Sequence, residues 1–452
     1  MKMIYDVKDK PKSGQVIVFA FQQLLAIMAA TIAVPMIIGN GMSIAAALFG
    51  AGVGTLVYVL FTKANSPVFL GSSFAFLGSM AAAFAGAVTA EAGFAGLILG
   101  AFFAGLVYVV IALIVKKVGV NWLNKLMPVV VIGPTVAIIG LGLAGNAVGD
   151  LQTANVEGGS TLIAVLCGLV TVLVVTLCST YGKKMARLIP FIIGILAGYI
   201  VAAIFTAIGF AAGIDALKIL DFSPVTNLVA GGVTFSTFFS IPEFSFVKSL
   251  SGWGKLDAGY IGTIAAAYMP VAFVVFAEHI ADHKNISSII EKDLLEEPGL
   301  HRTLLGDGVG SMIGAFFGGC PNTTYGESVA CVAITRNASV VTIMTTAVMA
   351  IIISFISPII AFLSSIPSCV MGGVCMTLYG FIAVSGLKMI QKVDLNENKN
   401  LFVVSVILIA GIGGLSLNFG KITITSVATA LILGILLNIL LSGEKKEDEK
   451  AE

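Results

Sequence analysis

The stretch CPNTTYGESVA, residues 320–330, interrupts a part of the sequence that is otherwise strongly apolar. Pro321 is followed by NTTY, residues that favour extended backbone over helix. Gly326 then opens a helix-compatible run whose second residue is Glu327. Extended backbone at membrane depth has to satisfy its N–H and C=O groups inside the protein, because lipid offers no partner. The stretch therefore predicts a short strand that leads into a half-helix.

A matching stretch, SPVFLGSSFAF, occupies residues 66–76 in the first half of the chain. It also begins with a proline, Pro67, and continues through extended-type residues and Gly71 into a helix-compatible run. We expect the two strands to pair with each other as short antiparallel strands. The free N–H groups at the two half-helix starts would then face a cavity and attract partial negative charge. The alternative is that proline and glycine only kink two ordinary helices.

The composition identifies the environment of these stretches. The chain of 452 residues is 58% hydrophobic and 11% charged, whereas a soluble domain is about 25% charged. The sequence therefore predicts an all-α integral membrane protein. The polar start of the chain lacks the architecture of a cleavable signal, and the net charge of +1 gives no indication of a nucleic-acid partner.

Fourteen apolar segments have about the length that a bilayer span requires, and the two interrupted stretches are the third and the tenth. Fourteen divides into two seven-span repeats, and an odd number of spans inverts the second repeat relative to the first. The predicted spans are 15–38, 43–62, 67–87, 92–115, 121–145, 159–179, 187–210, 258–281, 303–318, 322–336, 339–364, 367–387, 400–418 and 422–442.

The basic residues predict the orientation of these spans. With the N-terminus in the cytoplasm, 21 of the 25 Lys and Arg residues fall on the inner side and four on the outer side. Both termini are then cytoplasmic and the membrane is the plasma membrane. The predicted divisions are a cytoplasmic segment 1–14, a first repeat 15–210, an extracellular loop 211–257 with an interfacial helix or lid, a second repeat 258–442 and a disordered cytoplasmic tail 443–452.

Two acidic residues lie inside apolar runs: Glu278 in VAFVVFAEHI and Glu327 in the tenth segment. A carboxylate at the bilayer centre costs roughly 2.5–3.5 kcal/mol on insertion scales, so we expect both to serve a function. Asp282 follows Glu278 by four residues and shares its helical face, either as a functional acid or as an acid at the membrane interface. His279 is interpreted as a packing or supporting residue rather than a metal ligand.

The chemistry of these acids predicts the kind of ligand. Two carboxylates and two half-helix N–H groups present acceptors and donors that suit a flat, neutral, amide-like heterocycle. None of the 25 basic residues lies mid-span, which disfavours an anion. A buried carboxyl whose protonation differs between the substrate-bound and free states couples proton flow to substrate flow, and Glu278 is the expected coupling acid.

Other site types are less well supported by the residues. The six cysteines contain no CxxC pair and no Cys/His cluster, so neither a metal nor a cofactor is expected. Paired carboxylates could serve an intramembrane protease, but no Gly-Asp motif occurs within a span. The sequence therefore favours a transporter over an enzyme.

Several motifs then resemble those of the uracil permease branch of the nucleobase–ascorbate transporter family, also called nucleobase–cation symporters. They are LGSSFAF (70–76), AEH (277–279), KDLLEEPGLHR (292–302), PNTTYGE (321–327), AITR (333–336), VMGG (370–373) and LYG (378–380). The resemblance implies a core domain of spans 1–4 and 8–11 and a gate domain of spans 5–7 and 12–14. It also implies proton-coupled uptake of uracil by an elevator-like movement of the core, in a homodimer.

By position, the resemblance assigns Glu278 and Glu327 to substrate binding, together with the backbone N–H groups of Phe74 and Gly326 and the adjacent Tyr325. It assigns Tyr379 to the link between domains. We further expect Gln23, Ser73 and His279 to support the site from behind, and Asp282 to take part in proton coupling beside Glu278.

This chain departs from the family pattern at a few positions. Gln23 and Asp282 stand where many members carry histidine, and Ser328, Ala330 and Cys375 replace the usual Asn, Gly and Ser. These departures leave sodium open as the coupling ion and xanthine or another nucleobase open as the substrate. The related anion-transporter fold is a further alternative, against which the two glutamates argue.

Overall fold

A computed structural model of the chain describes residues 3–119, 127–183, 185–419 and 422–442. Most of the start of the fifth predicted span and the predicted disordered tail 443–452 lie outside the described residues. The same holds for some of the charges that predict the orientation, namely Lys2, Lys125, Lys184, Lys421, Lys445, Lys446 and Lys450.

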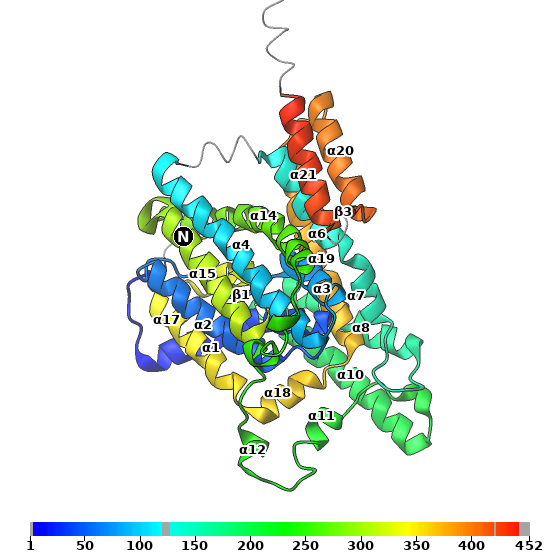
Figure 1. Cartoon of the computed structure of the whole chain (residues 1–452). Coiled ribbons are helices and arrows are strands. Elements are labelled where there is room, and N and C mark those ends of the chain that lie inside the picture. Colours follow the sequence, from blue (N-terminus) through cyan, green and yellow to red (C-terminus); the bar gives the residue numbers. More distant parts are fainter. Residues whose placement is uncertain (1–2, 120–126, 184, 420–421, 443–452) are drawn as a thin grey trace, which may run out of the picture.

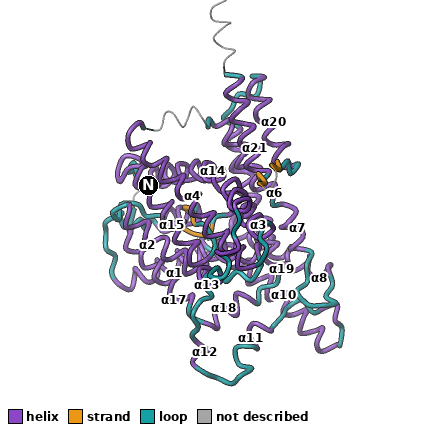
Figure 2. Tube along the Cα trace, in the orientation of Figure 1, coloured by secondary structure: helices purple, strands orange, loops and turns teal. Residues whose placement is uncertain are grey.

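The described residues of the first half form helices and one short strand, joined by loops and turns (Figures 1 and 2). Its described elements are α1 (Ser13–Ile38), α2 (Ile44–Phe61), β1 (Leu70–Ser72), the 3₁₀ turn η1 (Phe74–Phe76), α3 (Leu77–Ala85), α4 (Ala90–Val118), α6 (Val129–Gly142), α7 (Ala144–Leu151), α8 (Thr161–Tyr181), α9 (Met185–Leu188) and α10 (Pro190–Ala212).

A connecting region with short helices leads into the second half. It contains η2 (Asp215–Leu217), α11 (Ser223–Thr226), α12 (Phe235–Phe238), α13 (Ser245–Lys248) and η3 (Trp253–Lys255). The second half contains α14 (Ala258–Ile290), η4 (Leu295–Gly299), α15 (Leu300–Gly318), β2 (Asn322–Thr324), α16 (Gly326–Thr335), α17 (Val340–Ser354), α18 (Ser357–Ser364), α19 (Ser368–Ile390), α20 (Asn398–Ile412), β3 (Leu417–Phe419), β4 (Ile422–Ile424) and α21 (Ser426–Leu440).

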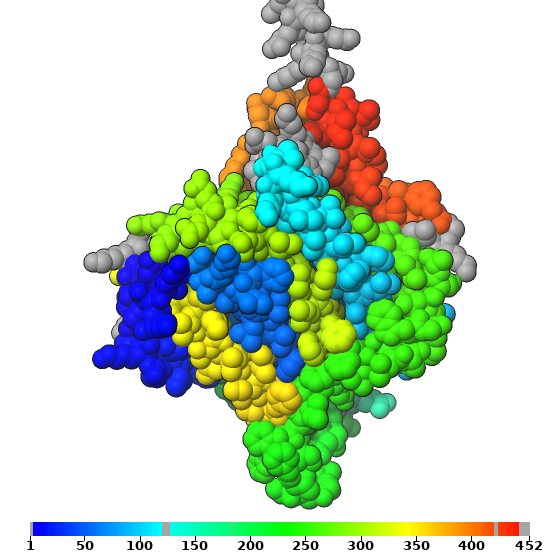
Figure 3. All heavy atoms as spheres, turned by 60° about the vertical axis from the view of Figure 1, so that its left-hand side comes forward, coloured from blue at the N-terminus to red at the C-terminus, as the bar shows by residue number. Residues whose placement is uncertain are grey.

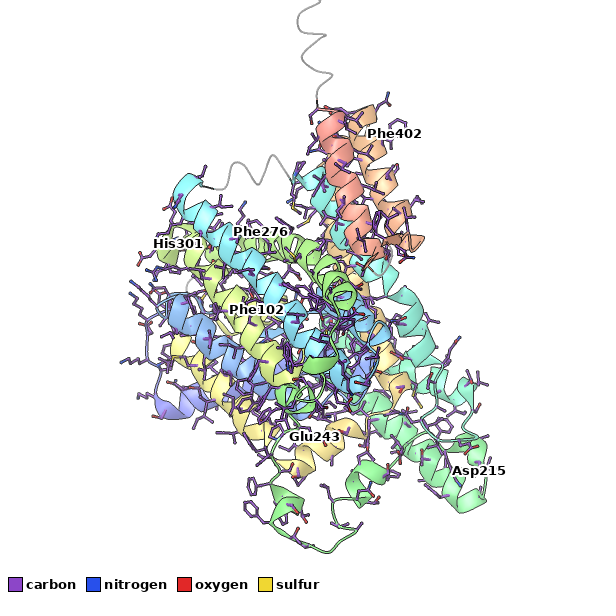
Figure 4. The ribbon with its side chains drawn as sticks, in the orientation of Figure 1. Phe102, Asp215, Glu243, Phe276, His301 and Phe402 are labelled. Carbon is purple, nitrogen blue, oxygen red and sulfur yellow. The ribbon has the colours of Figure 1, made fainter. Side chains whose placement is uncertain are left out.

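The helices have the character of membrane spans. Within the described ranges, eight helical segments are long and apolar enough to cross a bilayer, and five shorter apolar helices accompany them. Large apolar side chains lie on the outside of the helical body, as Phe102 on α4 and Phe402 on α20 illustrate, with 50% and 60% of their surface exposed (Figure 4). Such an outer surface suits lipid, which agrees with the predicted helical membrane protein.

The helices pack in two groups. In the first, α15 packs between α2 and α4, α17 packs on α1 and α2, and α14 packs on α4. In the second, α19 packs on α6, α7 and α8, α10 packs on α8, and α20 lies against α6 and α21. We call these the α15 group and the α19 group. Each group contains helices from both halves of the chain, and the space-filling view shows α2 beside segments of the second half (Figure 3).

The two interrupted stretches meet in the middle of the molecule. Strand β1 pairs antiparallel with β2, with Leu70 opposite Thr324, Gly71 opposite Thr323 and Ser72 opposite Asn322. The ladder is extended at its end by the N–H of Ser73, which donates to the carbonyl oxygen of Pro321 at 2.9 Å. The extended backbone thus finds partners within the protein, as membrane depth requires.

Gly71 and Gly326 do not occupy corresponding positions in the two stretches, so the predicted match between them is wrong. Gly326 opens α16, whereas Gly71 lies inside strand β1, and the turn after it begins only at Phe74. The strand requires glycine at position 71 for a steric reason, because a Cβ there would collide with the ring of Tyr325, which lies against the strand. Tyr325 also donates from its hydroxyl to the carbonyl oxygen of Ser72 at 2.8 Å.

This contact gives a first prediction. Gly71→Ala pushes a methyl group into the Tyr325 ring, and overpacking of a buried site costs about 1–3 kcal/mol. We expect the melting temperature of the purified protein in detergent to fall by several degrees. Gly145→Ala is the matched control, because a Cβ at Gly145 meets no atom within 4 Å. Equal melting temperatures for Gly71→Ala and Gly145→Ala would contradict this packing argument.

Three predicted spans differ from the helices of the structure. The predicted span 339–364 breaks into α17 and α18, because Pro358 lacks an N–H and cannot continue the preceding helix. The facing ends of the last two predicted spans instead form the antiparallel hairpin β3–β4. There α20 ends before Gly414, which has a φ of 73°, and the β-branched residues of ITIT, 422–425, favour a strand.

The N-terminal segment is tied to the α15 group. Tyr5 forms a parallel bridge with Asn337, and the Lys292 ammonium donates to Oδ2 of Asp6 at 2.6 Å. This hydrogen bond from Lys292 lowers the pKa of the Asp6 carboxyl. Both side chains of the pair are about half exposed, so the pair contributes little to stability.

Candidate functional site

A cavity of about 440 Å³ lies between the α15 group and the α19 group. Elements η1, β2 and α16 pack on helices of the α15 group and are counted with it from here on. The α15 group so defined contributes Phe74, Glu278, Asp282, Thr323, Thr324, Tyr325, Gly326 and Glu327 to the cavity lining. The α19 group contributes mainly apolar residues, among them Val136 and Ile139 from α6 and Leu378, Phe381 and Ile382 from α19. The cavity therefore has an acidic wall and an apolar wall.

Helix α14 supplies two of the carboxylates. Glu278 and Asp282 are one turn apart, both half-buried and both in the cavity lining. Thr324, the last residue of β2, donates from its hydroxyl to Oδ2 of Asp282 at 2.7 Å. This bond joins α14 to the strand ladder directly beside Glu278, so Asp282 belongs to the cavity wall.

Helix α16 supplies the third carboxylate. Glu327 lies in the first turn of α16, where the helix dipole favours a negative charge. A Cβ on Gly326 would lie 4.0 Å from Oδ1 of Asp282, so the start of α16 faces the acids of α14. Gly326 and Phe74 are each the first residue of a helical turn, where the N–H has no intrahelical acceptor. Donors and acceptors thus come together at one end of the cavity.

The aromatic residues lie at the boundary of the two groups. Phe74 lines the cavity, and its ring meets that of Tyr379 on α19 edge to face, with centroids 6.0 Å apart. Tyr379 is 2% exposed and joins the α19 group to the turn after β1. The Tyr325 ring lies against Gly71, so Tyr325 holds the ladder as well as lining the cavity.

Gln23 and Ser73 lie behind the cavity wall and outside its lining. The side-chain amide of Gln23 on α1 donates to the hydroxyl oxygen of Ser328 at 2.5 Å, and the backbone N–H of Phe69 donates to the same oxygen at 3.0 Å. Gln23 thus fixes the first turn of α16, next to Glu327. Ser73 is buried and joins the strand ladder through its backbone.

His279 points away from the cavity into the α15 group. Its Nδ1 lies 2.7 Å from Oδ2 of Asp307 and its Nε2 lies 3.0 Å from the hydroxyl of Thr303, both on α15. All three side chains are fully or almost fully buried. These bonds fix the rotation of α14, and with it the direction of the neighbouring Glu278.

Sequence reasoning missed some of the cavity residues. Their residue types predict only a strand at Thr323 and Thr324, although both residues line the cavity. Arg187 also lines it, from the connector between α8 and α10, although no basic residue lies mid-span. Nothing in the spacing of Arg187 indicates this position, because it depends on how the two groups pack.

Comparison with known proteins places the chain among transporters. A sequence model described as the permease family matches residues 14–419. The uracil permease of Bacillus caldolyticus is 40% identical to this chain over 99% of its length and 97% of the relative. The uracil permease of Bacillus subtilis (strain 168) is 38% identical over the same shares of the two chains.

The fold also resembles a solved structure. The transmembrane domain of the cyanobacterial bicarbonate transporter BicA superposes with a TM-score of 0.63, over 96% of this chain and 99% of that one, at 15% identity. At this level of identity the likeness concerns the fold alone, and it agrees with a helical membrane transporter.

Proposed function

Because this chain belongs to the permease family that includes the bacterial uracil permeases, and is therefore a multi-pass membrane transporter and not an enzyme, we propose that it imports uracil together with a proton. The observation that carries the proposal is the acidic wall of the cavity, where Glu278, Asp282 and Glu327 lie beside two helix starts.

Uracil fits this arrangement chemically. Its ring is flat and neutral, and N–H and C=O groups alternate along its edge. Carboxylates accept hydrogen bonds from the ring N–H groups, and the N–H groups of Phe74 and Gly326 donate to the ring carbonyls. The apolar wall from α6 and α19 covers the face of the ring. Such a combination of apolar lining and few convergent polar groups is typical of small-ligand sites.

We propose that Glu278 carries the coupled proton, with Asp282 as its neighbour in the pathway. Glu278 lies in the wall of the cavity, and among the described residues no Lys or Arg forms an ion pair with it. A carboxylate that has no fixed cation beside it can be neutralised by a mobile cation. A proton neutralises it without needing further oxygen ligands, and sodium is the alternative coupling ion.

The two helix groups supply the moving parts in this proposal. The α15 group, as core, carries the acids, and the α19 group, as gate, covers them with an apolar surface that allows sliding. Movement of the core would expose the cavity to each side of the membrane in turn. The fourteen spans in two inverted repeats, the cytoplasmic termini in the plasma membrane and a homodimer complete the proposed architecture.

The substrate is tested by uptake into proteoliposomes. We expect labelled uracil to be taken up, and unlabelled uracil to compete more strongly than xanthine, because the relatives that are 38–40% identical to this chain are uracil permeases. Uptake that xanthine blocks better than uracil would identify a xanthine or broader nucleobase permease instead.

A further inference from the structure

The cavity extends beyond the acids that the proposed transport uses. Its lining continues to Arg187, an exposed residue on the short helix α9. Among the described residues, no carboxylate forms an ion pair with Arg187. The cavity thus contains three carboxylates in one part and an unpaired guanidinium in another.

The position of Arg187 is set by its neighbours. Leu188, the next residue, is buried and clusters with Ala26 of α1 and Cys331 of α16. The side-chain amide of Gln22 on α1 also donates to the sulfur of Met185 at 3.2 Å. Helix α9 therefore rests on the α15 group although it connects α8 to α10, both helices of the α19 group.

The cavity lining extends along α16. Glu327 and Ile334 both line the cavity, and they are about 10 Å apart along the helix at a rise of about 1.5 Å per residue. Ser179 and Ser385, also in the lining, offer hydroxyl groups from the α19 group. A volume of about 440 Å³ is typical of sites for drug-sized ligands and exceeds what one pyrimidine ring fills.

We propose that the cavity also binds a pyrimidine nucleoside monophosphate, with the base among the carboxylates, the ribose along α16 and the phosphate on Arg187. This inference rests on the proposed role of the acids in binding the base. The planar guanidinium of arginine matches a phosphate through two parallel hydrogen bonds. Such a ligand joins the acids of the α15 group to α9, which connects two helices of the α19 group. It would thereby hold the two groups in the present arrangement and act as a competitor that is not transported.

The test measures binding of labelled uridine 5′-monophosphate and labelled uridine to the purified protein by equilibrium dialysis. We expect the monophosphate to bind at least tenfold more tightly than uridine, and unlabelled uracil to displace both. In Arg187→Gln this preference should fall to about one. The preference is a ratio within one preparation, so partial unfolding of a variant does not change it. Lys183→Gln is the control, because it removes a charge from the same connector without lining the cavity.

Three results would overturn the inference: equal binding of the two ligands to the unmodified protein, an unchanged preference in Arg187→Gln, or no displacement by uracil. Uracil uptake by the same preparation tests the transport proposal separately. If uptake is absent while the preference still depends on Arg187, the transport proposal fails and the nucleotide site stands.

Discussion

Replacement of Glu278 by Gln is expected to reduce uracil accumulation against a gradient to background, because the proposed coupling acid is then lost from the cavity wall. Glutamine keeps the size of the side chain and its hydrogen-bonding capacity but neither takes up nor releases a proton at ordinary pH. Exchange of external for internal uracil, which needs no net proton movement, should continue at a measurable rate. Counterflow and uphill uptake in the same proteoliposomes measure the two quantities.

Glu157→Gln is the matched control for this variant, since Glu157 is an exposed residue outside the cavity lining. It should leave both uphill uptake and counterflow unchanged. Uphill uptake by Glu278→Gln within a factor of two of the unmodified protein would show that Glu278 is not the coupling acid.

Replacement of Glu327 by Gln is expected to weaken uracil binding, whereas uracil transport should remain coupled to the proton. Hydrogen bonds to charged groups contribute about 1.5–3 kcal/mol, so the dissociation constant should rise roughly ten- to hundredfold. Because Gly326 and Glu327 are the first residues of α16 and lie at the cavity, the substitution should weaken binding of the base and leave the stability of the fold unchanged. Isothermal titration with uracil measures the affinity, and the melting temperature without ligand checks the fold.

The contrast between the two variants is informative in itself. Coupled uptake by Glu327→Gln should recover when the uracil concentration is raised, whereas uptake by Glu278→Gln should not. Unchanged uracil affinity in Glu327→Gln would remove Glu327 from the binding site.

The sequence predicts those features that appear as polar interruptions of an apolar chain. NTTY after Pro321 has residue preferences that oppose a helix in lipid, and the structure has a strand there that pairs with the matching stretch after Pro67. Glu278 was identifiable because a charge within an apolar run is costly. The membership of the permease family, which the motifs indicated, is confirmed.

The sequence could not indicate contacts that depend on how distant helices pack. The bond from Thr324 to Asp282 joins residues 42 positions apart, and either side chain alone has an ordinary interpretation. The sequence pattern matches Gly71 with Gly326, whereas the place of Gly71 inside β1 depends on the Tyr325 ring across the ladder. Arg187 lies at the end of a predicted span, and only the position of α9 against α16 brings it to the cavity.

The most direct test of the account is the driving force for uracil uptake into proteoliposomes of the purified protein. With an imposed pH gradient, acidic outside, and no sodium, we expect labelled uracil to accumulate above its external concentration, and a proton ionophore to abolish the accumulation. Accumulation that requires a sodium gradient, or that persists when the pH gradient is collapsed, would contradict proton-coupled uracil import.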